Sequence, residues 1–121
     1  MQPEEQLKCE FLLLKIYCSS KSLFFAKKPR YSTQSPCAPK KPMWLNKIKM
    51  KLKKKNYHKV GEFVQDVRLI FQNHSTYYKN HKFVMLGHQQ EAKFEVDFKD
   101  LFGIQETIVE RITPSGSIIL L

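Results

Sequence analysis

The clearest pattern of apolar and polar positions lies between Val60 and Tyr78. Apolar or aromatic residues recur there at intervals of three and four: Val60, Phe63, Val64, Val67, Ile70, Phe71, Tyr77 and Tyr78. This spacing puts them in one stripe along a helix, while polar and charged residues take most of the remaining positions. Because such a helix must bury its stripe against other helices, the pattern predicts a helical bundle. Core packing alone would also explain this periodicity.

Two helices are predicted before this one. Residues 4–18 are apolar on more than one side, and their expected core stripe is Leu7, Phe11, Leu14 and Cys18. Residues 42–54 begin with a proline and should face the core with Leu45, Ile48 and Leu52. Between them, residues 19–41 form a long connection rich in Ser, Pro and Lys. A connection of this length usually has a function or is disordered.

One helix is predicted after it, over residues 83–102. Its expected core positions are Phe83, Leu86, Phe94, Phe98 and Leu101. Gly87 should weaken this helix by about 1 kcal/mol, and Gly103 is expected to end it. Residues 107–121 change character, because Pro114 and Gly116 break any helix. We therefore expect one domain over residues 1–106 and a divergent, poorly ordered tail over residues 107–121.

Composition and residue spacing argue against several classes of protein. The hydrophobic fraction of 42% fits one globular domain, and no apolar run is long enough to span a membrane. The three cysteines are without CxxC spacing, which argues against a disulfide framework or a zinc site and favours a reducing compartment. Four histidines (His58, His74, His81 and His88) have no Cys or carboxylate partners at metal-binding spacing. No nucleotide-binding or hydrolase motif occurs, so we expect no enzyme, no metal and no cofactor.

Basic and acidic residues are distributed unevenly along the chain. The net charge is +10, and no Asp or Glu occurs between Phe11 and Gly61. Such a basic region attracts phosphates or acidic protein surfaces, although a solvated face that aids solubility would give the same pattern. The residues that could contact a polyanion are Lys27, Lys28, Arg30, Lys47, Lys51, Lys54 and Lys55.

Several runs resemble one known family. FVQDVRLIFQNHSTYY, ending at Tyr78, resembles the third helix of a bromodomain, the acetyl-lysine-binding four-helix module of chromatin proteins. PMWLNKIKMKL, over residues 42–52, is similar to the helix before it. EEQLKCEFLLLKIYC and FGIQE are closer to the nuclear-body speckled-protein family, and the resemblance covers about residues 3–106. It implies an all-α, left-handed four-helix bundle with a long loop between the first two helices.

The resemblance also implies where a ligand would bind. LFFAKKPRY matches the loop that carries a hydrophobic shelf and a water-holding tyrosine, which puts Phe24 and Phe25 on the shelf and Tyr31 at the tyrosine. The usual Trp-Pro-Phe shelf is absent. Tyr78 falls where most bromodomains have an asparagine that donates to the acetyl oxygen, and its ring would fill much of the slot. An atypical acetyl-lysine pocket is therefore expected at Phe24, Phe25, Tyr31, Tyr77, Tyr78, Phe83 and Val84.

By the same resemblance, the protein would be nuclear, associated with nuclear bodies, responsive to interferon and active in transcription regulation. Its partners would be chromatin or histone tails and nuclear-body proteins. Relatives carry a PHD finger and a SAND domain ahead of the bromodomain, and neither occurs here, so we expect a truncated paralogue, an isoform or a fragment. Two alternatives remain: a basic nucleic-acid-binding module, and a protein-docking fold whose pocket Tyr78 closes.

Overall fold

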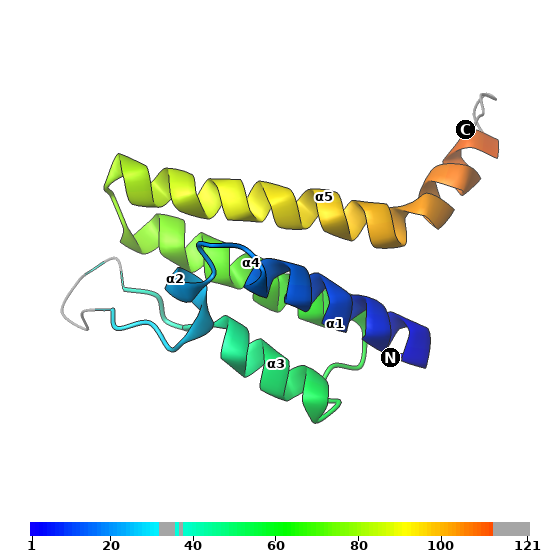
Figure 1. Cartoon of the computed structure of the whole chain (residues 1–121), viewed down its shortest axis with the longest axis horizontal. Coiled ribbons are helices and arrows are strands. Elements are labelled where there is room, and N and C mark those ends of the chain that lie inside the picture. Colours follow the sequence, from blue (N-terminus) through cyan, green and yellow to red (C-terminus); the bar gives the residue numbers. More distant parts are fainter. Residues whose placement is uncertain (32–35, 37, 113–121) are drawn as a thin grey trace.

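Four long helices form a bundle, and a single-turn helix lies in the connection between the first two (Figure 1). The computed structural model describes residues 1–31, 36 and 38–112, with side chains described as far as residue 103. The helices are α1 (Pro3–Tyr17), α2 (Leu23–Ala26), α3 (Leu45–Lys53), α4 (Val60–Tyr77) and α5 (His81–Ile112). The described ranges contain no strand, and the predicted all-α bundle is confirmed. No helix in these ranges is long and apolar enough to cross a membrane.

Helix α1 buries a different face from the one expected. Its buried residues are Cys9, Leu12, Leu13 and Ile16. In the predicted stripe, Leu7 is 65%, Phe11 49% and Leu14 58% exposed, and Cys18 is also exposed, so that prediction was wrong. The sequence of α1 is apolar on two sides, and contacts with α3, α4 and α5 select one of them.

Helices α3 and α4 bury the residues that their periodicity predicts. Helix α4 buries Phe63, Val64, Val67, Ile70 and Phe71, and α3 buries Leu45, Ile48 and Leu52. Helix α3 begins at Leu45 rather than at the proline three residues earlier. Trp44 occupies its N-cap position and makes no side-chain capping hydrogen bond. The first turn of α3 is therefore held mainly by packing, since an indole has no acceptor for its free N–H groups.

Helix α5 begins earlier and ends later than predicted. It starts at His81 and passes through Gly103 to Ile112, so Gly103 does not end it. Phe94 is buried, and Phe98 and Leu101 pack partly against the core, whereas Phe83 is 38% exposed. The first six residues of the expected tail belong to this helix, and residues 113–121 lie outside the described residues. A two-pronged ion pair joins α5 to α4, with both Arg68–Glu95 distances at 2.8 Å.

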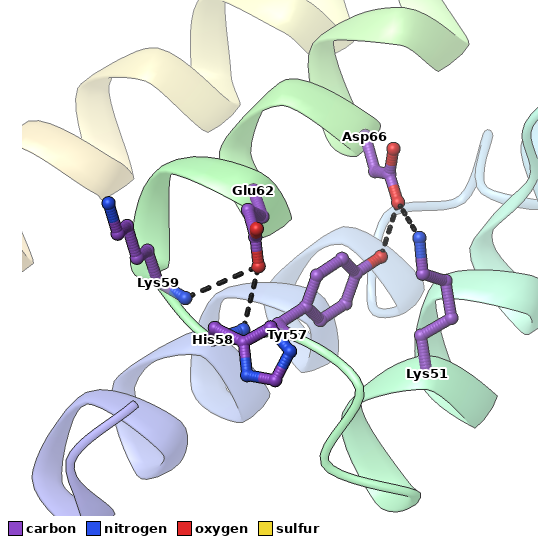
Figure 2. A network of polar contacts seen from close by, with 6 residues as sticks. All are labelled: Lys51, Tyr57, His58, Lys59, Glu62 and Asp66. Atoms are coloured by element: carbon purple, nitrogen blue, oxygen red, sulfur yellow. Dashed lines mark hydrogen bonds and ion pairs between the residues drawn. The ribbon is translucent and has the colours of Figure 1, made fainter.

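A polar network joins α3 to α4 (Figure 2). Asp66, only 6% exposed, accepts hydrogen bonds at Oδ2 from Lys51 Nζ (2.8 Å) and from the Tyr57 hydroxyl (2.6 Å). The Lys51 ammonium also lies 4.6 Å from the centre of the Tyr57 ring. Lys55, in the turn that follows α3, takes the left-handed backbone conformation with φ of 57°. Lys51 is thus committed to Asp66, although the sequence suggested that it was free to contact a polyanion.

Candidate functional site

Five aromatic residues from three parts of the chain meet where α4 ends and α5 begins. We call Phe24, Tyr31, Tyr77, Tyr78 and Phe83 the aromatic cluster. Its ring centres are 4.5 Å apart for Tyr31–Tyr77, 4.9 Å for Tyr77–Tyr78, 5.3 Å for Tyr78–Phe83 and 5.8 Å for Phe24–Phe83. These separations lie in the range of favourable tilted and edge-to-face pairs. The structure therefore brings together five of the seven residues expected at the pocket.

The two adjacent phenylalanines of α2 have separate positions. Phe25 is 4% exposed, and its ring lies 5.3 Å from Phe71 and 5.1 Å from His74 of α4. Phe24 is 50% exposed and contacts Phe83. Phe25 thus fixes α2 to α4, while Phe24 belongs to the aromatic cluster.

Tyr78 has the largest number of neighbours in the cluster. It follows the last residue of α4, and its backbone N–H donates to the carbonyl of His74 at 3.0 Å. Its half-buried ring also lies 6.4 Å from Tyr31 and 4.8 Å from His74. Burial, with smaller effects of Tyr78 and Tyr77, raises the pKa of Tyr31 to about 12, so the Tyr31 hydroxyl stays a neutral donor at physiological pH.

The last of the expected pocket residues, Val84, follows Phe83 in α5. Val84 is half-buried on the first turn of α5, where its backbone N–H donates to Asn80 at 3.0 Å. Asn73 is buried, and its side-chain amide donates to the carbonyl of Lys41 at 2.8 Å. This amide therefore anchors the long connection to α4 and is already engaged in that hydrogen bond.

His74 was not expected at the site from its sequence pattern. The ring is 3% exposed and hydrogen-bonds through Nε2 to the backbone oxygen of Phe83, which joins the ends of α4 and α5. A Cβ at Gly87 would lie 2.6 Å from Cδ2 of His74, so the glycine allows α5 to approach this ring. Burial lowers the pKa of His74; the Phe83 carbonyl opposes this shift, and His88 adds to it.

The lowered pKa predicts a loss of stability in mild acid. The unfolded chain would bind a proton near pH 6.5 while the folded state still resists it, so the free energy of unfolding should fall as pH drops below about 6.5. The loss cannot exceed about 1.4 kcal/mol per pH unit for one group. Urea denaturation between pH 7.5 and 5 should show it, and His74→Gln should flatten the dependence. The exposed residue His81 offers a control, and a matching flattening in His81→Gln would contradict this assignment.

The seven basic residues expected to contact a polyanion divide into three groups. Lys28 and Lys47 both lie over the ring of Trp44, at 6.0 and 5.1 Å from its centre. Lys51 pairs with Asp66. The others are exposed, and none makes an ion pair within the described part of the chain: Lys27, Arg30, Lys54 and Lys55. Over the same ranges, no group of three or more His, Cys, Asp or Glu is placed to hold a metal ion.

Comparisons with known proteins agree on the family. The family model described as Bromodomain matches residues 9–87. The solved bromodomain of human BAZ1A superposes with a TM-score of 0.69 at 28% identity, covering 78% of this chain and 91% of that one. The E3 ubiquitin-protein ligase TRIM33 is 38% identical over 106 residues in Homo sapiens and 43% over 81 residues in Xenopus laevis. These alignments cover 80% and 60% of this chain.

The chain spans less than a tenth of the length of these curated relatives, 9% of the human protein and 7% of the Xenopus protein. TRIM33 is not a member of the speckled-protein family. The comparisons therefore support the bromodomain resemblance and do not support the narrower one.

Proposed function

Because this chain belongs to the bromodomain family, we propose that it is the non-enzymatic, chromatin-associated module of a nuclear transcription regulator, and that the ring of Tyr78 closes its acetyl-lysine pocket. Bromodomains bind acetylated histone tails, so histone tails are the partners to test first. The ligase activity in the names of its TRIM33 relatives belongs to those longer proteins. The wider assignment to nuclear bodies and the interferon response rests on the resemblance in sequence, and imaging of the tagged protein in interferon-treated cells tests it.

One observation carries the proposed closure: the position of the Tyr78 ring in the aromatic cluster. An acetylated lysine is neutral, and binding it requires an apolar slot and a donor for its amide oxygen, since burying that oxygen unpaired costs about 1–3 kcal/mol. Tyr78 has three cluster neighbours within 6.4 Å and the ring of His74 at 4.8 Å. Opening a slot would separate these pairs, which are worth about 0.5–1.5 kcal/mol each. A ligand would therefore have to displace Tyr78 before it gained a contact.

Replacing Tyr78 by asparagine should open the pocket. We expect the wild-type chain to show no acetyl-dependent change when titrated with acetylated and unacetylated histone-tail peptides. Tyr78→Asn removes the ring and supplies an amide donor, worth about 1–3 kcal/mol, or a preference for the acetylated peptide of about 5- to 160-fold. NMR shifts of the variant should be concentrated at Tyr31, Tyr77 and Phe83.

Tyr78→Phe is the matched control, because it keeps the ring and removes the hydroxyl. It should behave like the wild type. If the wild type binds acetylated peptide and Tyr78→Phe does not, the hydroxyl acts as the donor and the closure is refuted. A folded Tyr78→Asn with a well-dispersed spectrum and no acetyl-dependent shift would refute the assignment of this cluster to acetyl-lysine.

A further inference from the structure

The middle of the chain carries a large positive charge that the fold leaves mostly unpaired. Eleven Lys and Arg residues lie between Lys27 and Lys55, and no Asp or Glu lies among them. All eleven are described, and of these only Lys51 makes an ion pair with another described residue. Like charges at this density repel one another and do not help folding. Unpaired positive charge of this kind attracts polyanions.

Two of these positive charges lie near the ring of Trp44. Lys28 comes from the long connection and Lys47 from the first turn of α3, and both ammonium groups lie within 6.0 Å of the centre of the Trp44 ring. We call these three residues the Trp44 cluster. A cation over an indole face is attracted by the ring, which limits the freedom of its long side chain. The ring thus gathers two charges from different parts of the sequence around one side chain, and exposed Lys27 and Arg30 lie close to Lys28 in the sequence.

We propose that the Trp44 cluster binds the phosphate backbone of duplex DNA. Ammonium groups are compact point charges that suit single phosphate oxygens without a fixed fork geometry. Duplex DNA presents one charge per about 1.7 Å along its axis, and neutralising its phosphates releases counterions. The choice of DNA among polyanions rests on the proposed chromatin role. The Trp44 cluster shares no residue with the aromatic cluster, and Trp44 and Lys47 lie at the start of α3 rather than at the end of α4.

The dependence of DNA binding on salt tests this site. Fluorescence anisotropy of a labelled duplex, titrated with the whole chain between about 50 and 200 mM salt, gives the slope of log K against log salt. The double variant Lys28→Gln/Lys47→Gln should reduce that slope by about 1.8, the value for two lost phosphate contacts, and weaken binding most at low salt. The matched control is Lys93→Gln/Lys99→Gln. It removes two exposed charges from α5, which lies on the far side of α1 and α4 from α3 (Figure 1).

A third variant separates binding from folding. Trp44→Asp removes the ring that holds both lysines and adds a negative charge, so DNA affinity should fall although Lys28 and Lys47 are both kept. Aspartate is also a good N-cap residue, which offsets the loss of ring packing at the start of α3. Thermal unfolding should therefore show a folded protein, and anisotropy should show that its affinity for DNA is reduced.

Three results would overturn the proposal. Absence of binding at low salt excludes the site. Equal loss in the two double variants would show that only net charge matters. Equal binding of poly-glutamate with the same dependence on Lys28 and Lys47 would exclude DNA as the intended polyanion. The peptide titration of Tyr78→Asn is independent of all three, so failure of DNA binding and failure of the proposed histone-tail function can be told apart.

Discussion

Phe25→Ala should lower the free energy of unfolding by about 3–4 kcal/mol, whereas Phe24→Ala, at the preceding residue, should lower it by less than about 1 kcal/mol. The two side chains are chemically identical and adjacent in α2. Phe25 is 4% exposed against Phe71 and His74, and Phe24 is 50% exposed. Truncating the buried ring leaves a cavity in the core and releases α2 from α4, whereas truncating the other removes contacts that water can replace.

Urea denaturation followed by far-UV circular dichroism measures both variants. The slope of the free energy of unfolding against urea concentration should be the same as for the wild type, because each substitution alters stability rather than the surface exposed on unfolding. Equal destabilisation by the two substitutions would contradict the packing of α2 described above. In Phe25→Ala we also expect the contact between Phe24 and Phe83 to be lost, because a released α2 no longer holds the two rings together.

Asp66→Ala should cost about 3 kcal/mol, the second largest effect. The carboxylate is buried and accepts charged or short hydrogen bonds from Lys51 and Tyr57, so its removal leaves two donors unpaired between α3 and α4. Burial, followed by the hydrogen bond to Asp66, raises the pKa of Tyr57, so its hydroxyl remains a donor throughout the accessible pH range. Tyr57→Phe, which removes one of the two bonds, should cost about half as much.

Asp100→Ala is the control for this network. Asp100 is exposed on α5 and makes no ion pair with any residue that the structure describes. Its substitution should change the free energy of unfolding by less than about 0.5 kcal/mol. Thermal or urea unfolding of both variants at one pH gives the comparison, and a loss at Asp66 no larger than at Asp100 would show that the network of Figure 2 does not stabilise the bundle.

Periodicity predicted the helices well where one face alone is apolar. Helix α4 was found to within one residue at its end because its stripe is unambiguous. In α1 the same reasoning selected the wrong face, since Leu7, Phe11 and Leu14 fit the helical period as well as Leu12, Leu13 and Ile16 do. Only contacts with the rest of the bundle decide between such faces. Four residues are too few to show a period, which is why α2 was not predicted.

The buried polar residues had a signal in the sequence that was not used. Asp66, Asn73 and His74 continue the spacing of three and four set by Phe63 and Ile70, so they lie on the buried side of α4. Their polarity made them look exposed. Each finds a partner from another segment: Lys51 and Tyr57, the carbonyl of Lys41, and the carbonyl of Phe83. Such distant partners cannot be identified from a local pattern.

The family resemblance indicated the individual residues of the candidate site. It did not indicate which of them contact one another. Tyr31, Tyr78 and Phe83 come from a loop, a helix end and the next helix, and no spacing relates them. The meeting of Lys28 and Lys47 on Trp44 depends equally on the path of the long connection. Both clusters are therefore properties of the fold, although every member was visible as an aromatic or basic residue.

The way in which the main chain holds position 78 has a genetic consequence. The backbone N–H of Tyr78 is bonded to His74, a contact that does not depend on the side chain. Replacing tyrosine by asparagine there leaves the end of α4 in place, and the codons for these two amino acids differ by a single base. Under the proposed closure, one point mutation would separate a closed pocket from an open one, and genomes that carry either allele would provide a natural version of the peptide-binding experiment.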